Sequence, residues 1–237
     1  MNAPSVLSLL TRAAAERQAR HGASWSIGIA ALGIANLFAC AYLERYIGTG
    51  SDADGFMLLF AVESFFLLLT GAAVINRELA VIAARTRVMP LTSSQRYDFV
   101  FLSLLRHRAM VMISATALFA VAVLGHGTAA TIAGRCVLTG LLITLLAALM
   151  STIMVLHVRP GATTRSIIAV IGIAVFALLT ITAVIAPGPV LNVIYPLRWT
   201  THGVVAVSHG SILPALPEAT YLALTAAACI IVGRRHA

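Results

Sequence analysis

The sequence predicts an all-α polytopic membrane protein that forms a single transmembrane domain over residues 1–237. Hydrophobic residues make up 60% of the chain and charged residues only 10%, whereas a soluble domain of this length carries about 25% charged residues. Apolar runs long enough to cross a membrane, which takes about 20 helical residues, recur along the chain. The basic residues gather in the segments between these runs, as is typical of membrane proteins.

Six apolar runs are predicted to be transmembrane helices, at residues 23–43, 55–75, 109–124, 136–156, 167–186 and 219–233. The third and sixth runs are short for a crossing. The third extends backward through residues 99–105, with Arg106 and Arg108 reaching to the headgroups. The sixth begins at Pro217 and Glu218, because proline suits the first helical position and an acid suits the first turn.

The arginines predict the orientation in the membrane. All sixteen basic residues are arginine, and the chain has no lysine. With the N-terminus in the cytoplasm, thirteen arginines lie inside and three, Arg45, Arg135 and Arg198, lie outside. This asymmetry follows the positive-inside rule and places both termini in the cytoplasm. The net charge of +8 is therefore explained by topology, and no nucleic-acid partner is expected.

Two further segments are predicted to lie at the membrane surface. In residues 1–22, Val6, Leu7 and Leu10 share a helical face, which indicates an interfacial helix under the membrane. Residues 187–218, on the outside, are too apolar for a plain loop. We expect a pair of short re-entrant helices there, one starting at Thr200 or Thr201 and ending at Gly210.

Residues 76–108 form the most polar part of the chain and carry six of its arginines. The pattern predicts a short helix that Pro90 ends, because proline disfavours helical backbone in the residue before it. Thr92 and Gln95 then have the spacing of a capping box, which starts a second helix. That second helix is predicted to run on into the third span. The segment would present a helix, a sharp turn and a helix to the cytoplasm.

Polar residues inside the predicted spans are the candidates for a substrate path. Glu63 is the only acid well inside a span, where an unpaired carboxylate is costly. It either faces a translocation path or makes an interhelical hydrogen bond. Asn36 lies among small residues of the first span, whose spacing suits packing within the chain or against another subunit. The histidines are scattered, so neither a metal site nor a catalytic motif is expected.

Two local sequences carry a resemblance to a known family. The first is the stretch 77–92, which starts with Arg77-Glu78 and ends in the turn Met89-Pro90-Leu91-Thr92. The second is Tyr195-Pro196-Leu197-Arg198-Trp199, before the sixth span. With the predicted architecture, they resemble the permease subunit of ABC-2 type exporters. The chain departs from the family pattern in residues 79–85, which contain no glycine.

The resemblance implies a subunit of the bacterial inner membrane that pairs with a second copy and with a separate ATPase. The partner would bind ATP and magnesium, and this chain would hold no cofactor and not be an enzyme. Spans one and five would line the interface between the copies. The residues implied to lie at or near the ATPase contact are Glu78, Arg85, Arg87, Pro90, Leu91 and Thr92. A standard Walker A motif needs a lysine, and this chain has none. This agrees with ATP being bound by a separate chain.

Two other functions fit the same sequence. The chain could be a membrane scaffold or immunity subunit that binds a partner through residues 76–108 and transports nothing. It could also be a proton-coupled secondary transporter with Glu63 as the proton site, although many such transporters carry internal repeats and this sequence shows none. The substrate stays open in every case.

Overall fold

The computed structural model describes Ser64 and residues 91–124, 128–156, 196–209 and 212–236. Every regular element in these ranges is helical. The elements are α5 (Ser93–Leu105), α6 (Arg108–Leu124), α7 (Ala129–Leu156), α10 (Pro196–Ser208), the short 3-10 helix η2 (Leu213–Ala215) and α11 (Leu216–His236). The predicted all-helical class therefore holds for this part of the chain.

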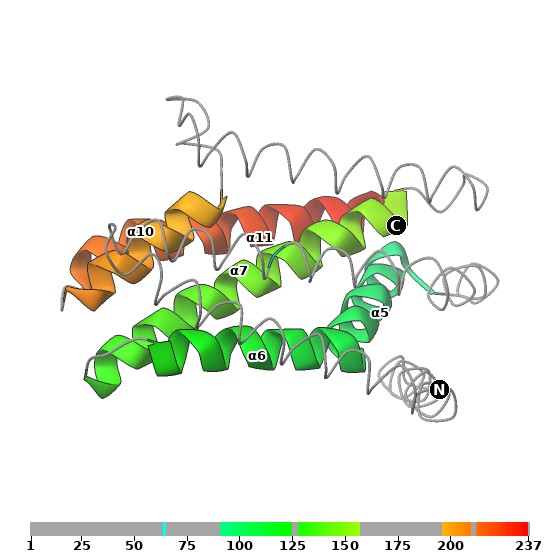
Figure 1. Cartoon of the computed structure of the whole chain (residues 1–237). Coiled ribbons are helices and arrows are strands. Elements are labelled where there is room, and N and C mark those ends of the chain that lie inside the picture. The colour runs from blue at the N-terminus through cyan, green and yellow to red at the C-terminus, as the bar shows by residue number, and fades with distance from the viewer. Residues whose placement is uncertain (1–63, 65–90, 125–127, 157–195, 210–211, 237) are drawn as a thin grey trace, which may run out of the picture.

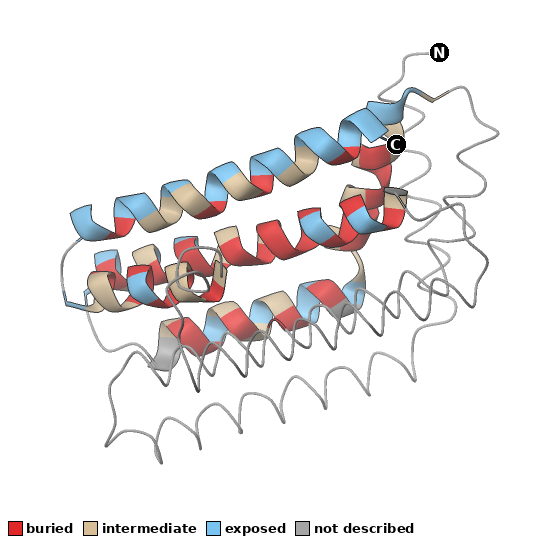
Figure 2. Cartoon of the chain, turned by 90° about the horizontal axis from the view of Figure 1, so that it is seen from above, coloured by how far each residue is buried: buried red, intermediate tan, exposed pale blue. Residues whose placement is uncertain are grey.

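Helix α7 is the centre of the described bundle. It lies between α6 and α11 in both views of the ribbon (Figures 1 and 2). Most of α7 is buried, whereas α11 keeps an exposed outer face (Figure 2). Helix α10 packs at the end of the bundle where α7 and α11 begin, and α5 packs where both end. We call these the α10 end and the α5 end.

Two described helices are long and apolar enough to cross a membrane, Ala129–Val155 and Leu213–His236. Helices α5 and α6 together make a third candidate, bent by 60° at the break between them. The chain is thus a helical membrane protein. Helices α7 and α11 run in the same direction and α6 runs in the opposite one, as predicted for the fourth, sixth and third spans. The other predicted spans and the 1–22 helix lie outside the described residues.

Helix α7 begins seven residues before the predicted start of the fourth span. The hydroxyl of Thr128 accepts a hydrogen bond from the Thr131 backbone N–H at 3.4 Å, so Thr128 caps the first turn. The fourth span was predicted to start at residue 136, just after Arg135, and this start was wrong, because the helix already begins at Ala129. Arg135 lies inside α7 and is only 3% exposed, because neighbouring helices cover it.

The predicted continuous helix from Thr92 into the third span was also wrong. Helix α5 ends at Leu105, and α6 begins at Arg108 in a direction 60° away. At the break, the His107 N–H donates to the Leu104 carbonyl at 3.1 Å, a tighter pattern than the α-helix. The bend leaves Arg106 and Arg108 exposed, and it turns α5 toward α7 and α11.

The helix predicted to start at Thr200 or Thr201 begins earlier, at Pro196. Proline suits the first position of a helix because its fixed backbone angle φ is close to the helical value. It has no backbone N–H, but an N–H at this position would have no partner within the helix. The two threonines do not cap. Their hydroxyls donate to the carbonyls of Pro196 at 3.0 Å and Leu197 at 2.8 Å, one turn back. The predicted end at Gly210 lies outside the described residues.

The same pattern pairs four hydroxyls inside α7. In α7, four hydroxyls donate to carbonyls one turn earlier, at 2.8–2.9 Å: those of Thr139, Thr144, Ser151 and Thr152. Lipid offers no hydrogen bonds, so polar groups at this depth must be paired within the protein. Because each hydroxyl is paired with a carbonyl of its own helix, α7 can contain polar side chains in the centre of the bundle.

Leu222 and Leu224 of α11 allow a matched test of this packing. Leu222 is fully buried and Leu224 is 66% exposed. We expect Leu222→Ala to lower the free energy of unfolding by about 2 kcal/mol or more, because it leaves a cavity in the bundle. Leu224→Ala should change it little, since lipid or detergent fills the space. Thermal unfolding of the purified protein in detergent measures both, and equal losses would show that α11 is wrongly placed.

Candidate functional site

The residues predicted to meet a partner lie mostly outside the described ranges. Leu91 and Thr92 are described, at the start of α5. Residues outside these ranges are Glu78, Arg85, Arg87, Pro90, Glu63 and Asn36. The candidate site is therefore built from the start of α5 and from the contacts that fix α5 to the bundle.

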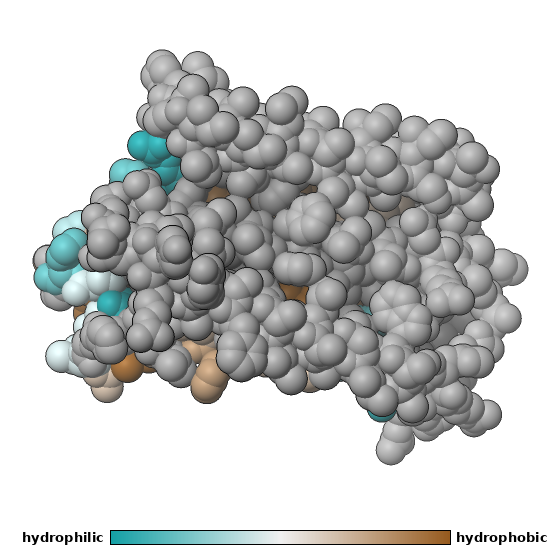
Figure 3. All heavy atoms as spheres, viewed as in Figure 1, coloured by the Kyte–Doolittle hydropathy of each residue, from teal (hydrophilic) through white to brown (hydrophobic). Residues whose placement is uncertain are grey.

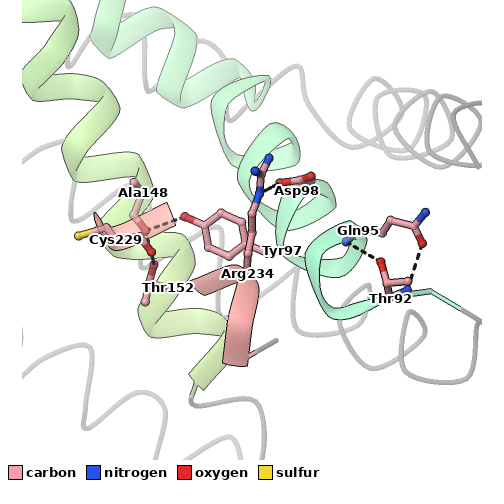
Figure 4. A network of polar contacts seen from close by, with 8 residues as sticks. All are labelled: Thr92, Gln95, Tyr97, Asp98, Ala148, Thr152, Cys229 and Arg234. Atoms are coloured by element: carbon pink, nitrogen blue, oxygen red, sulfur yellow. Dashed lines mark hydrogen bonds and ion pairs between the residues drawn. The ribbon is translucent and has the colours of Figure 1, made fainter. Parts of the chain in front are cut away.

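The predicted capping box at the start of α5 is confirmed. The Gln95 N–H donates to the Thr92 hydroxyl at 3.3 Å, and the Thr92 N–H donates to the Gln95 side-chain oxygen at 3.0 Å (Figure 4). Each side chain thus pairs one backbone N–H that a helix start leaves free. Thr92, Ser93 and Ser94 are exposed, so the capped end is an accessible surface.

One face of α5 is buried against α7 and α11. Tyr97 and Leu104 are fully buried and Val100 is 3% exposed, and they recur at the spacing of a helix face. The Tyr97 hydroxyl crosses to α7 and donates to the Ala148 carbonyl at 3.3 Å.

The ring of Tyr97 also packs on Gly233, near the end of α11. A Cβ added at Gly233 would lie 2.1 Å from Cε2 of Tyr97 and 2.9 Å from the hydroxyl oxygen of Thr152. Only glycine allows this approach. Beside it, the Thr152 hydroxyl of α7 lies 2.9 Å from the Cys229 carbonyl of α11, within hydrogen-bond distance. Three helices therefore meet at one point.

An ion pair lies at the solvent side of this contact. The Nε atom of Arg234 is 2.8 Å from a carboxylate oxygen of Asp98 (Figure 4). The Arg234 side chain is 49% exposed and that of Asp98 is 28% exposed, so water screens their attraction. Such a pair contributes about 0–1 kcal/mol. The packing of Tyr97 on Gly233 therefore holds the helices together, and the ion pair orients their ends. We call Tyr97, Gly233, Asp98 and Arg234 the α5–α11 junction.

A second close contact occurs at the α10 end. A Cβ added at Gly203 of α10 would lie 2.9 Å from a methyl carbon of Leu138 in α7 and 3.2 Å from Cβ of Glu218 in α11. Trp199 of α10 stacks on Tyr221 of α11, with ring centroids 4.5 Å apart. Small and flat side chains thus let α10 touch both long helices. We call the pair of rings the α10–α11 stack.

Charge is also buried at this end. The buried Arg135 of α7 donates from Nε to the hydroxyl of Ser208 in α10 at 3.0 Å. Hydrophilic side chains gather at the α10 end of the molecular face in Figure 3, and hydrophobic ones appear further along it. Among the described residues, no three His, Cys, Asp or Glu side chains are grouped to hold a metal ion.

Sequence reasoning missed both contacts. The pair Tyr97-Asp98 was a usable signal, because two polar residues stand together before an apolar run. The pair Gly233-Arg234 was another, at the end of the sixth apolar run. One pair lies in the second turn of α5 and the other in the last turn of α11, and only the fold brings them together.

The fold and these contacts define a helical membrane protein whose described helices are tied together at both ends. Comparisons with protein-family models, with curated proteins and with solved structures found no match.

The capping box gives one test of the α5 start. Thr92→Ala removes the hydroxyl that pairs a free N–H, and we expect it to lower the free energy of unfolding by about 1 kcal/mol. Ser94→Ala is the control, because Ser94 is equally exposed and alanine favours the helix interior. Thermal unfolding in detergent compares them. A control that loses as much stability as Thr92→Ala would contradict the capping role.

Gly233 gives a test of the three-helix contact. We expect Gly233→Ala to cost about 1–3 kcal/mol, because the added methyl overlaps a fully buried ring. Gly140→Ala is the control, since nothing lies within 4 Å of a Cβ added there. The control should leave stability unchanged or slightly raised. The melting temperatures of both variants decide, and a Gly233→Ala variant as stable as the unaltered chain would rule out the contact.

Proposed function

We propose that this chain is the membrane subunit of an ATP-driven exporter of the ABC-2 type. It pairs with a second copy in the bacterial inner membrane and receives energy from a separate ATPase, which binds ATP and magnesium. The six-span topology with both termini in the cytoplasm, the interfacial helix 1–22 and the outer segment 187–218 belong to this proposal. Membrane lipid surrounds the pair.

The observation that carries the proposal is the arrangement of α5. Its capped start is exposed, while its body is buried against α7 and α11. A partner that pushes on the start of α5 therefore pushes on two long apolar helices. The arginine-rich residues 76–90 directly precede this start. The start of α5 connects the basic segment to the long apolar helices. This arrangement suits a protein that transmits force from a partner better than a scaffold that only binds one.

Charge supports the same interpretation. Among the described residues at the α5 end, Asp98 is the only acid, and it pairs with Arg234. The arginines that remain there are Arg96, Arg106, Arg108 and Arg235. Complementary charge steers association and fixes the register of an interface. An ATPase with an acidic docking surface fits this end of the chain.

The implied contact residues Glu78, Arg85, Arg87, Pro90, Leu91 and Thr92 belong to this proposed surface. Glu63 and Asn36 stay candidates for the substrate path. The lack of lysine places a standard nucleotide site on another chain. The cargo is left open, because no described cavity defines its chemistry.

The docking role is tested by reversing charge in the basic segment. We expect Arg85→Glu with Arg87→Glu to reduce several-fold the ATPase subunit that stays bound after detergent extraction, and the ATP hydrolysis that it shows in the complex. The physical reason is repulsion at an interface that depends on opposite charge. Arg198→Glu, at the α10 end, is the control and should retain both.

Two results would decide against the exporter, and one would decide only against its docking residues. Purification from native membranes without any protein that carries a Walker A motif would favour a scaffold. Unchanged hydrolysis in the doubly reversed variant would show that the docking residues are wrong. Gradient-driven flux by this chain alone, abolished in Glu63→Gln, would favour a secondary transporter.

A further inference from the structure

Helix α11 contacts the helices at both ends of the bundle. At one end, Gly233 receives the ring of Tyr97 from α5, and Arg234 pairs with Asp98. At the other end, Tyr221 stacks on Trp199 of α10. Both contacts lie on α11, one continuous helix of 21 residues, and Tyr221 and Gly233 are 12 residues apart on it, or about 18 Å. At 1.5 Å per residue the whole helix is about 30 Å long, close to the thickness of the bilayer core.

Both ends of α11 are closely packed against their neighbouring helices, most tightly at the glycines. At the α5–α11 junction, a side-chain atom on Gly233 would overlap the ring of Tyr97. At the α10–α11 stack, the two rings lie nearly parallel, at 18°. Beside that stack, Glu218 of α11 also lies against Gly203 of α10. Closely packed interfaces switch between discrete arrangements and do not deform gradually.

We propose that α11 is a lever that carries movement of α5 through the membrane to α10. The inference rests on the proposed function, because the ATPase partner would supply the movement at α5. Helix α7 would hold α11 in place along its length during this movement, since the Thr152 hydroxyl of α7 lies within hydrogen-bond distance of the Cys229 carbonyl of α11. The outer helix α10 would then respond to events at the opposite face.

Helix α10 offers a reporter position. His202 lies on α10 and is exposed, so His202→Cys can be labelled by a thiol reagent that does not cross membranes. The native cysteines, Cys40, Cys136 and Cys229, are replaced by alanine in all variants. Labelling is measured in membranes that contain the ATPase partner, with ATP and vanadate added to trap the nucleotide-bound state, and without them.

We expect trapping to change the labelling rate of the reporter by about threefold or more, an effect of about 0.6 kcal/mol or more. Tyr221→Leu removes the ring from the α10–α11 stack but keeps an apolar side chain, and it should abolish the change. Asp98→Arg should weaken it by repulsion from Arg234. The charge swap Asp98→Arg with Arg234→Asp restores opposite charges and should restore the response.

The outcomes separate the two proposals. If trapping changes labelling equally in the Tyr221→Leu, Asp98→Arg and unaltered chains, the lever is wrong while the exporter stands. If the partner hydrolyses ATP but labelling of the unaltered chain never responds, the lever is again wrong. If no ATPase is bound or active with the unaltered chain, the proposed function fails, and the lever fails with it. Leu224→Ala, exposed on the same helix, is the control and should respond normally.

Discussion

The described structure depends on the approach of Gly233 to the ring of Tyr97. A Cβ at position 233 would overlap that ring, so any other residue would force α11 away from α5. Glycine inside a helix usually costs about 0.5–1 kcal/mol relative to alanine. Here the cost is offset by the burial of a large aromatic side chain and by its hydrogen bond to Ala148. This contact ties the first turns of α5 to the end of α11, while Val100 and Leu104 bury the rest of its inner face.

Small residues have this importance because the chain lies in lipid. Lipid tails are as apolar as leucine, so apolar area alone does not draw helices together. Close packing and internal hydrogen bonds must do so. Gly233 fulfils this at the α5 end, and Gly203 does so at the α10 end. Hydroxyls such as that of Thr139 donate to a carbonyl of their own helix and so need no partner from a second helix.

Much of the described fold could be predicted from the sequence, because the signals were local. The capping box of Thr92 and the acidic first turn of α11, at Glu218, depend on residues within one helical turn, and both are present. The bend before Arg108 was not predictable in this way, because no proline or glycine marks it. The early start of α7 was missed because Arg135 was taken as a boundary. Its Nε–H donates to the Ser208 hydroxyl of α10, a contact between segments far apart in the sequence. The partner-contact residues and Glu63 stay predictions.

The strengths of the contacts at the α5–α11 junction indicate which part can move. The ion pair of Asp98 and Arg234 is half in water and contributes about 0–1 kcal/mol, so it can part at little cost. Separating α5 from α11 would instead uncover the ring of Tyr97, which is fully buried and lies against Gly233, and would lose many close van der Waals contacts. Modest force on α5 would therefore shift α11 with it before it separated the two helices. The contact of Tyr97 with Gly233 therefore makes α5 and α11 move together. The weaker ion pair of Asp98 and Arg234 orients the ends of the two helices.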